Sequence, residues 1–266
     1  MKNLAASVRA RLLNLAREEN RNYNRLTLLY LQERFLARLG ESPYKEKFIL
    51  KGGLYLYSRY GAAARPTRDL DLLGRGIPND METIAEVLRE VLSQPMEDGV
   101  SFDPDSLKTQ RIKEGAEYEG VRVNFTARLD SLRTQLSLDV GFGDKINPAP
   151  KPLDFPVLLN LTEAPSPTIL VYNIETVIAE KLQAMAFLGY QNSRAKDFYD
   201  LYYASRTESL NAASLRKTVR ATFAHRATPL EDALKILAPS RTILIKHGWD
   251  SAKLTQSFQS PRISGE

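Results

Sequence analysis

The segment from Arg68 to Leu73 alternates acidic and apolar side chains, and this alternation constrains the fold more than any other feature. Asp69 and Asp71 are separated by Leu70 and followed by Leu72. Because successive side chains of a β-strand point to opposite faces, the leucines would enter a core while both carboxylates lie on the other face. The sequence therefore predicts a sheet that is buried on one side and carries paired acids on the other. A strand with an ordinary solvated outer face is the alternative.

A glycine pair precedes these acids in the sequence Lys51-Gly52-Gly53. Backbone without Cβ atoms can approach a triphosphate closely and offer it N–H groups. Two neighbouring carboxylates repel each other, and Mg²⁺ relieves this repulsion because it is commonly held by one or two carboxylates together with substrate phosphates. The two motifs together indicate a nucleotide site with a metal ion. A glycine pair alone is more typical of a turn.

A third carboxylate, Asp139, follows on a later predicted strand. Leu136, Leu138 and Val140 mark the core face of that strand and Asp139 the opposite face. Three acids from two strands could surround two metal ions roughly 3.5 to 4 Å apart, as in phosphoryl and nucleotidyl transfer. Asp69 and Asp71 would then hold the metals, and Asp139 would help to position or deprotonate the attacking hydroxyl. A surface acid at a strand end is the alternative for Asp139.

A lysine interrupts the apolar stripe of the next predicted helix. Lys181 lies at helical spacing among Ile174, Val177, Ile178, Leu182 and Met185. Its ammonium must reach water or meet an anion, and a phosphate would serve. Asp197 or Asp200, on the following helix, could pair with Lys181 and orient it. Either acid could instead form a structural salt bridge or stabilise a helix start.

The overall pattern predicts an α/β (α+β) protein with a mixed sheet, flanking helices and a helical C-terminal domain. Helices are expected near residues 1–15, at 28–39 ending at Gly40, and from a capping box at Asn79 and Glu82. Strands are expected at 68–73, 121–127 and 136–140, and a proline-rich linker at 145–168. Helices are expected again at 173–188, 194–205, 213–225 and after Pro229. The predicted domains are 1–45, 46–168 and 169–266.

Charge is distributed unevenly along the chain, which contains no cysteine. Residues 1–40 carry a net charge of +5, residues 41–200 of −5 and residues 201–266 of +5. This pattern suits cations bound at the centre and a polyanion bound by the ends, although chance explains it equally well from charge alone. The candidate polyanion contacts are Arg9, Arg11, Arg17, Arg21, Arg25, Arg216, Lys217, Arg220 and Arg226. Since no apolar stretch approaches the roughly 18 residues needed to span a bilayer, we expect a cytoplasmic protein with no membrane partner.

Four blocks of residues together resemble the AbiEii/AbiGii toxin family of the DNA polymerase β-like nucleotidyltransferase superfamily, which includes the mycobacterial MenT toxins. The blocks span roughly residues 46–205 and occur in the family's order: Lys51 to Gly53, Arg65 to Asp71, Glu180 to Leu182, and Arg194 to Leu201. Gly53 stands where many superfamily members have serine. Lys196 stands where arginine is more usual, and Asp139 matches the third carboxylate by its position on a later strand.

The resemblance implies a nucleotidyltransferase fold and a toxin of a toxin–antitoxin pair. Such a toxin, with Mg²⁺ or Mn²⁺, transfers nucleotides from an NTP to the 3′ acceptor end of tRNA or another RNA and stops translation; its partner is a cognate antitoxin protein. The implied metal ligands are Asp69 and Asp71, with Lys181 contacting the phosphates and Asp197 as an essential acid. The implied nucleotide-binding residues are Lys51, Gly52, Gly53, Thr67 and Lys181. Two alternatives remain: transfer to a small molecule or protein hydroxyl, and a non-catalytic nucleotide or RNA binder.

Overall fold

The computed structural model describes residues 3–114, 118–144, 146–162, 164, 166–189 and 195–237. The helices are α1 (Leu4–Glu18), α2 (Tyr23–Glu41), α3 (Gly52–Tyr60), η1 (Gly61–Ala63, a 3₁₀ turn), α4 (Met81–Leu92), α5 (Ile174–Leu188), α6 (Ala195–Thr207), α7 (Ala212–His225) and α8 (Leu230–Leu237). The strands are β1 (Phe48–Lys51), β2 (Asp69–Gly74), β3 (Val100–Glu114), β4 (Tyr118–Leu129), β5 (Leu132–Phe142), β6 (Lys151–Asp154) and β7 (Thr168–Val171).

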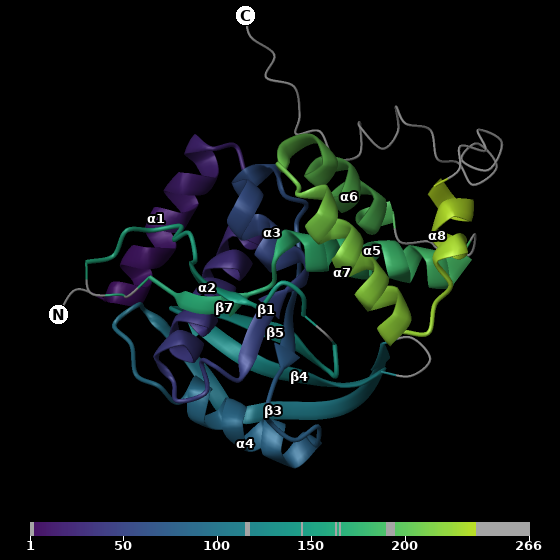
Figure 1. The fold of residues 1–266 in the computed structure, drawn as a ribbon. Coiled ribbons are helices and arrows are strands. Elements are labelled where there is room, and N and C mark those ends of the chain that lie inside the picture. Colours follow the sequence, from purple (N-terminus) through teal and green to yellow (C-terminus); the bar gives the residue numbers. More distant parts are fainter. Residues whose placement is uncertain are drawn as a thin grey trace, which may run out of the picture.

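A mixed sheet of seven strands forms the centre of the described part of the chain, in the order β3-β4-β5-β2-β1-β7-β6. The pairs β2–β5 and β1–β7 are parallel, and the remaining pairs are antiparallel. In Figure 1, α1 lies on the left, α4 lies below β3, and α5 to α8 gather at the upper right. The expected fold class, a mixed sheet with flanking helices followed by a helical part, is confirmed.

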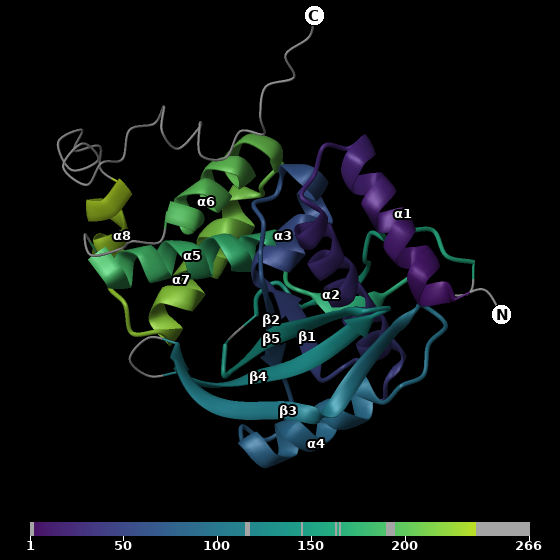
Figure 2. The same ribbon diagram turned by 180° about the vertical axis from the view of Figure 1, so that it is seen from behind.

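One face of the sheet is buried against helices α2 and α4. Leu70 and Leu72 of β2 are both fully buried, in the same core cluster as Leu36 of α2 and Leu88 of α4. The predicted alternation of β2 is thus correct, because its two leucines enter the core. Figure 2, from the other side, shows the long strands β3 and β4 curving between α4 below and the other helices above.

The helix boundaries follow capping side chains and one close backbone contact. Asp80, rather than the predicted Asn79, caps α4 by accepting a hydrogen bond from the N–H of Thr83 at 2.7 Å. Gly40 lies inside α2 instead of ending it. A Cβ on Gly40 would lie 2.7 Å from the carbonyl oxygen of Thr168, so this glycine lets β7 approach the helix.

The proline-rich segment predicted as a linker also contributes to the sheet. It contains strand β6, which pairs with β7, and its Phe155 is buried in the main core. Strand β7 itself crosses the expected boundary at residues 168 and 169. The division into three domains remains a prediction.

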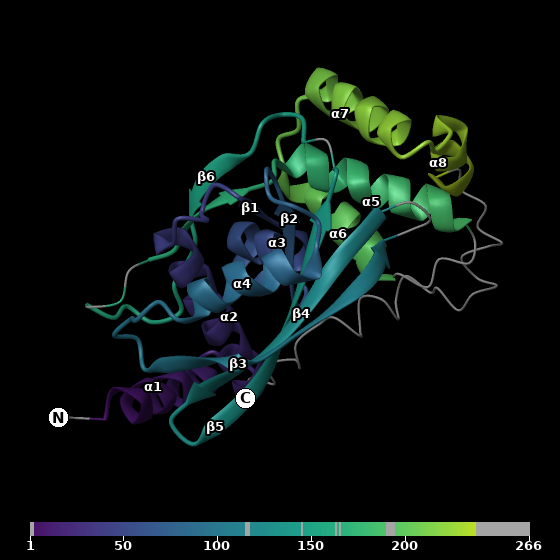
Figure 3. The ribbon, with the colours of Figure 1, turned by 90° about the horizontal axis from the view of Figure 1, so that it is seen from below.

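The C-terminal helices dock against α3. Arg59 of α3 forms an ion pair with Glu208, just beyond α6, and the rings of Tyr60 and Tyr203 lie 4.9 Å apart. Figure 3 shows α7 and α8 at the end of the molecule opposite α1. Within the described ranges, no helix combines the length and the apolar character needed to cross a membrane.

Candidate active site

The face of the sheet opposite the β2 leucines carries a row of charged residues at one level. The strand register aligns Lys51 of β1 with Asp71 of β2, Asp71 with Asp139 of β5, and Asp139 with Arg122 of β4. Directly paired residues in a sheet project their side chains from the same face. The structure therefore brings two predicted carboxylates together, with a cation on either side of them.

A second row lies beside the first and begins at Asp69. The register aligns Asp69 with Ser137 of β5, and Ser137 with Asn124 of β4. Asp69 is exposed whereas Asp71 is half-buried. The edge of the site at Asp69 is therefore open and lined by uncharged polar groups.

The glycine pair begins α3 directly against Asp71. Gly52 has a φ of +65°, a conformation that favours glycine, and a Cβ there would lie 2.0 Å from Oδ2 of Asp71. A Cβ on Gly53 would lie 2.8 Å from Cβ of Thr67. Both glycines are needed for the helix start to lie against the carboxylate strand. The predicted proximity of the glycine pair, Thr67 and the acids is thus found.

Lys181 lies in a buried cluster of alternating charges. Its Nζ is 2.8 Å from Oδ1 of Asp197 and 2.8 Å from Oδ2 of Asp200. Arg65 donates from Nε to both oxygens of Asp200, at 3.0 and 2.9 Å. Both aspartates therefore pair with Lys181. Asp200 also forms a salt bridge to Arg65, the structural role that the sequence left open as the alternative. A Cβ on Gly53 would also lie 3.4 Å from Nη1 of Arg65, so Arg65 links this cluster to the glycine pair.

Asp139 is held by an arginine that the sequence interpretation did not include. Arg122 donates from Nε and Nη2 to the two oxygens of Asp139, each at 2.7 Å. These hydrogen bonds, reinforced by the charges of Asp139, Asp69 and Asp71, raise the pKa of Arg122. In the part of the chain that the structure describes, no group of three or more His, Cys, Asp or Glu residues is arranged to hold a metal ion. Asp69 and Asp71 remain a predicted pair of metal ligands.

Lys51 reaches a second buried ion cluster. Its Nζ lies 3.3 Å from Oδ2 of Asp144 and 6.0 Å from the centre of the Tyr172 ring. Arg226 lies 2.6 Å from Oδ1 of the same aspartate. Burial would raise the pKa of Asp144, but the charges of Lys51 and Arg226 hold that pKa below its usual value. Lys51 thus ties the sheet to the C-terminal helices, and its contact with nucleotide remains a prediction.

Sequence reasoning gave no role to Arg65, Arg122 or Asp144, which are ion partners of the predicted site residues. The available signal for Arg122 was its position between Val121 and Val123, which places it on the polar face of its strand. Arg194, the first residue of the fourth family block, lies outside the described residues.

The start of α3 lies against the carboxylate strand, and Arg65 links it to the Lys181 cluster, an arrangement that suits the binding of nucleotide phosphates. The chain belongs to the AbiEii family, because residues 34–262 match the family described as "Nucleotidyl transferase AbiEii toxin, Type IV TA system". Membership makes the protein a nucleotidyltransferase of a toxin–antitoxin system, with an NTP substrate and a cognate antitoxin. The family resemblance seen in the sequence is confirmed. No curated protein matches the chain.

Two solved structures are similar to this chain. A putative nucleotidyltransferase from H. pylori is 17% identical, with a TM-score of 0.47 over 89% of this chain and 92% of that one. The antibiotic-resistance factor ANT(2'')-Ia is 15% identical, with a TM-score of 0.40 over 76% of this chain and 94% of that one.

Proposed function

We propose that this toxin transfers nucleotides from an NTP to the 3′ acceptor end of tRNA, releasing diphosphate, and so blocks translation in the cytoplasm. One observation carries the proposal: the start of α3 lies against the carboxylate of Asp71, so that phosphates bound at Gly52 and Gly53 meet the paired acids of β2. Backbone N–H groups at a helix start bind phosphates, and adjacent carboxylates bind the metal that accompanies them.

The donor set fits a divalent cation such as Mg²⁺ at Asp69 and Asp71. Both residues lie on one face of β2, and carboxylate oxygens with substrate phosphates are the ligands that Mg²⁺ prefers. When bound, the cation would neutralise charge developing on the transferred phosphoryl group. Asp139 is the third ligand of this proposal, and Arg122 opposes metal binding there because it places a positive charge on both carboxylate oxygens.

Lys181 is proposed to contact the NTP phosphates. Asp197 and Asp200 hold its ammonium on two sides, which fixes its direction and leaves one donor of the ammonium for phosphate. Asp197 thus acts as a positioning residue for Lys181. Removing it would free the lysine to adopt other rotamers and weaken the phosphate contact.

The proposed tRNA contacts are the exposed basic residues of α1, α2 and α7. They are Arg11, Arg17, Arg25, Arg216, Lys217 and Arg220. Arg226 leaves the candidate set, since its side chain is only 15% exposed and is bound to Asp144. Arg9 pairs with Asp130 but is 43% exposed, so RNA phosphates could replace that partner.

Incubation of the purified protein with each radiolabelled NTP, Mg²⁺ and total tRNA tests the proposal. We expect label in tRNA with the wild type and none with Asp71→Ala. The variant Asp103→Ala, which removes an acid outside the site, is the matched control and should label normally. Label in a protein band or a small product, with tRNA untouched, would establish the alternative acceptors. Nucleotide binding without any transfer would establish a non-catalytic binder.

A further inference from the structure

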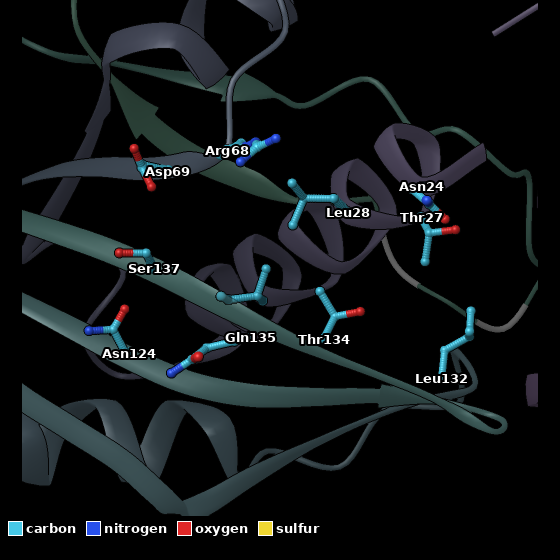
Figure 4. A pocket seen from close by; sticks show the side chains of 11 residues that line it. Asn24, Thr27, Leu28, Arg68, Asp69, Asn124, Leu132, Thr134, Gln135 and Ser137 are labelled. Carbon is cyan, nitrogen blue, oxygen red and sulfur yellow. The ribbon is translucent and has the colours of Figure 1, made fainter. Parts of the chain in front are cut away.

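A pocket of about 430 Å³ opens beside Asp69, on the side away from the glycine pair. It lies between helix α2 and strands β4 and β5, and Asp69 is the predicted site residue that lines it. Figure 4 shows Asp69, Ser137 and Asn124 following one another along one side of this pocket, as the strand register requires. Its volume falls within the range of roughly 300–1,000 Å³ usual for small-ligand sites.

Most residues that line the pocket are polar and uncharged, although the larger part of its lining surface is apolar. Amide groups come from Asn24, Asn124 and Gln135, and hydroxyl groups from Thr27, Thr134 and Ser137. Amides present a donor and an acceptor together, which matches the hydrogen-bonding edges of nucleobases. The leucines at positions 28, 132 and 136 add apolar surface for the face of a ring.

The charges exclude two other occupants. A triphosphate requires several cations, whereas Arg68 is the basic residue among those that line the pocket. A polycationic small molecule requires several acids, whereas Asp69 is the acid among the same lining residues. The lining therefore suits a neutral, ring-shaped group that can form several hydrogen bonds.

The pocket wall also contains a buried hydroxyl without a partner in the described part of the chain. Thr27 is only 4% exposed, and its Oγ1 is buried without a hydrogen-bond partner among the described residues. Leaving a buried polar group unpaired costs about 1–3 kcal/mol. Gln32, one turn further along α2, donates to the carbonyl oxygen of Arg68 at 2.9 Å and so fixes the pocket wall beside Asp69.

We propose that this pocket binds the unpaired 3′-terminal nucleotide of the acceptor RNA, which brings its hydroxyl to Asp69. The inference rests on the proposed function, because it names the acceptor subsite of the same centre. The NTP phosphates occupy the opposite side, at Gly52, Gly53 and Lys181. Thr27 and Gln135 bind the terminal base, and Ser137 lies between that base and Asp69.

Equilibrium binding of fluorescent RNA in the absence of NTP tests the pocket. The two probes are an RNA hairpin with an unpaired 3′ end and the same hairpin with a blunt end. The wild type should bind the unpaired end more tightly. Thr27→Val and Gln135→Ala should each weaken that binding about three- to tenfold, the loss of one hydrogen bond, and leave blunt-end binding unchanged. Binding of a fluorescent NTP analogue should be unaltered.

Gln110→Ala is the matched control, because Gln110 is an exposed glutamine on the same face of the sheet, outside the pocket lining. Thermal unfolding of each variant separates misfolding from loss of binding. Weakened NTP binding in the pocket variants would overturn the inference, and so would equal affinity for the two RNA ends in the wild type. If the pocket binds RNA as expected but no label is transferred, the proposed function fails while the acceptor subsite stands.

Discussion

Arg122 holds both carboxylate oxygens of Asp139 at 2.7 Å, and Asp139 lies directly beside Asp71 in the sheet. The guanidinium therefore neutralises the third acid and adds a positive charge next to the proposed metal ligands. Replacing Arg122 with leucine should free Asp139 and strengthen metal binding about tenfold, since removing one nearby charge changes the binding energy by about 1 kcal/mol or more.

Titration with Mn²⁺, followed by electron paramagnetic resonance, measures this effect without any nucleotide. Arg128→Leu removes an exposed arginine from the same strand and should leave the affinity near that of the wild type. The double variant Arg122→Leu with Asp139→Asn should lose most of the gain. Unchanged affinity in Arg122→Leu would mean that the ion pair does not limit metal binding.

Gly52 allows α3 to start against Asp71, and its replacement tests that contact. Gly52→Ala would put a Cβ 2.0 Å from Oδ2 of Asp71, whereas Gly61, with a similar φ of +56°, has nothing within 4 Å of such a Cβ. Each substitution also strains a backbone with positive φ, which costs about 1–3 kcal/mol for a residue with a Cβ. Only Gly52→Ala also displaces the carboxylate, so its transfer rate should fall about a hundredfold. Equal activity in the two variants, both shown to be folded by thermal unfolding, would refute the contact's importance.

The sequence predicted what depends on local periodicity. The alternation of acids and leucines in β2 and the lysine within the stripe of α5 are both visible without knowledge of the fold. The pairing of Arg122 with Asp139 depends on the register of β4 and β5, which no single strand reveals. Strand β3 was missed because Pro104 and an irregular register between Asp103 and Lys108 interrupt its alternation.

The end of helix α2 and the ion partner of Lys51 could not be predicted from the sequence either. Gly40 was predicted to end α2, but its role is to admit the backbone at Thr168, far along the chain. Asp144 was not considered, although it joins Lys51 to Arg226 across the sheet and the C-terminal helices. Both depend on contacts between distant segments, which composition and spacing do not specify.

Thr67 supplies a hydroxyl group where Gly53 lacks one. A Cβ on Gly53 would lie 2.9 Å from Oγ1 of Thr67, so the threonine fills the space of the serine common in the superfamily. Thr67→Val should weaken NTP binding about three- to tenfold, the effect of one hydrogen bond, because the hydroxyl that donates to the carbonyl oxygen of Asp69 at 3.2 Å would turn to a phosphate. Gly53→Ser alone should be destabilising, since overpacking costs about 1–3 kcal/mol. Gly53→Ser combined with Thr67→Ala should recover NTP affinity.

Calorimetric titration of an NTP into these variants gives the affinities directly. Thr207→Val is the matched control, because Thr207 also donates to a backbone carbonyl but lies at the end of α6. Undiminished NTP affinity in Thr67→Val, or no recovery in the double variant despite normal folding, would show that the Thr67 hydroxyl does not replace the serine.

Glu33 makes folding stability depend on pH in mildly acidic solution. Burial raises its pKa from 4.5 to about 6, and the opposing charge of Arg34 only partly offsets this. Between these two values the folded protein binds more protons than the unfolded chain. The free energy of unfolding therefore decreases as the pH rises through this window, by about 2 kcal/mol from this residue. Glu33→Gln should remove this decrease while keeping an acceptor for the N–H of Leu158.

Urea unfolding at a series of pH values measures the slope. The matched control is Glu41→Gln, which alters an exposed acid on the same helix and should retain the wild-type decrease. Glu33→Gln also removes the ion partner of Arg34, which should lower the free energy of unfolding at neutral pH. The two variants are therefore compared by how steeply this free energy changes with pH. A wild-type slope in Glu33→Gln would assign the pH dependence to another group and leave Glu33 ionised in the folded protein across the whole window.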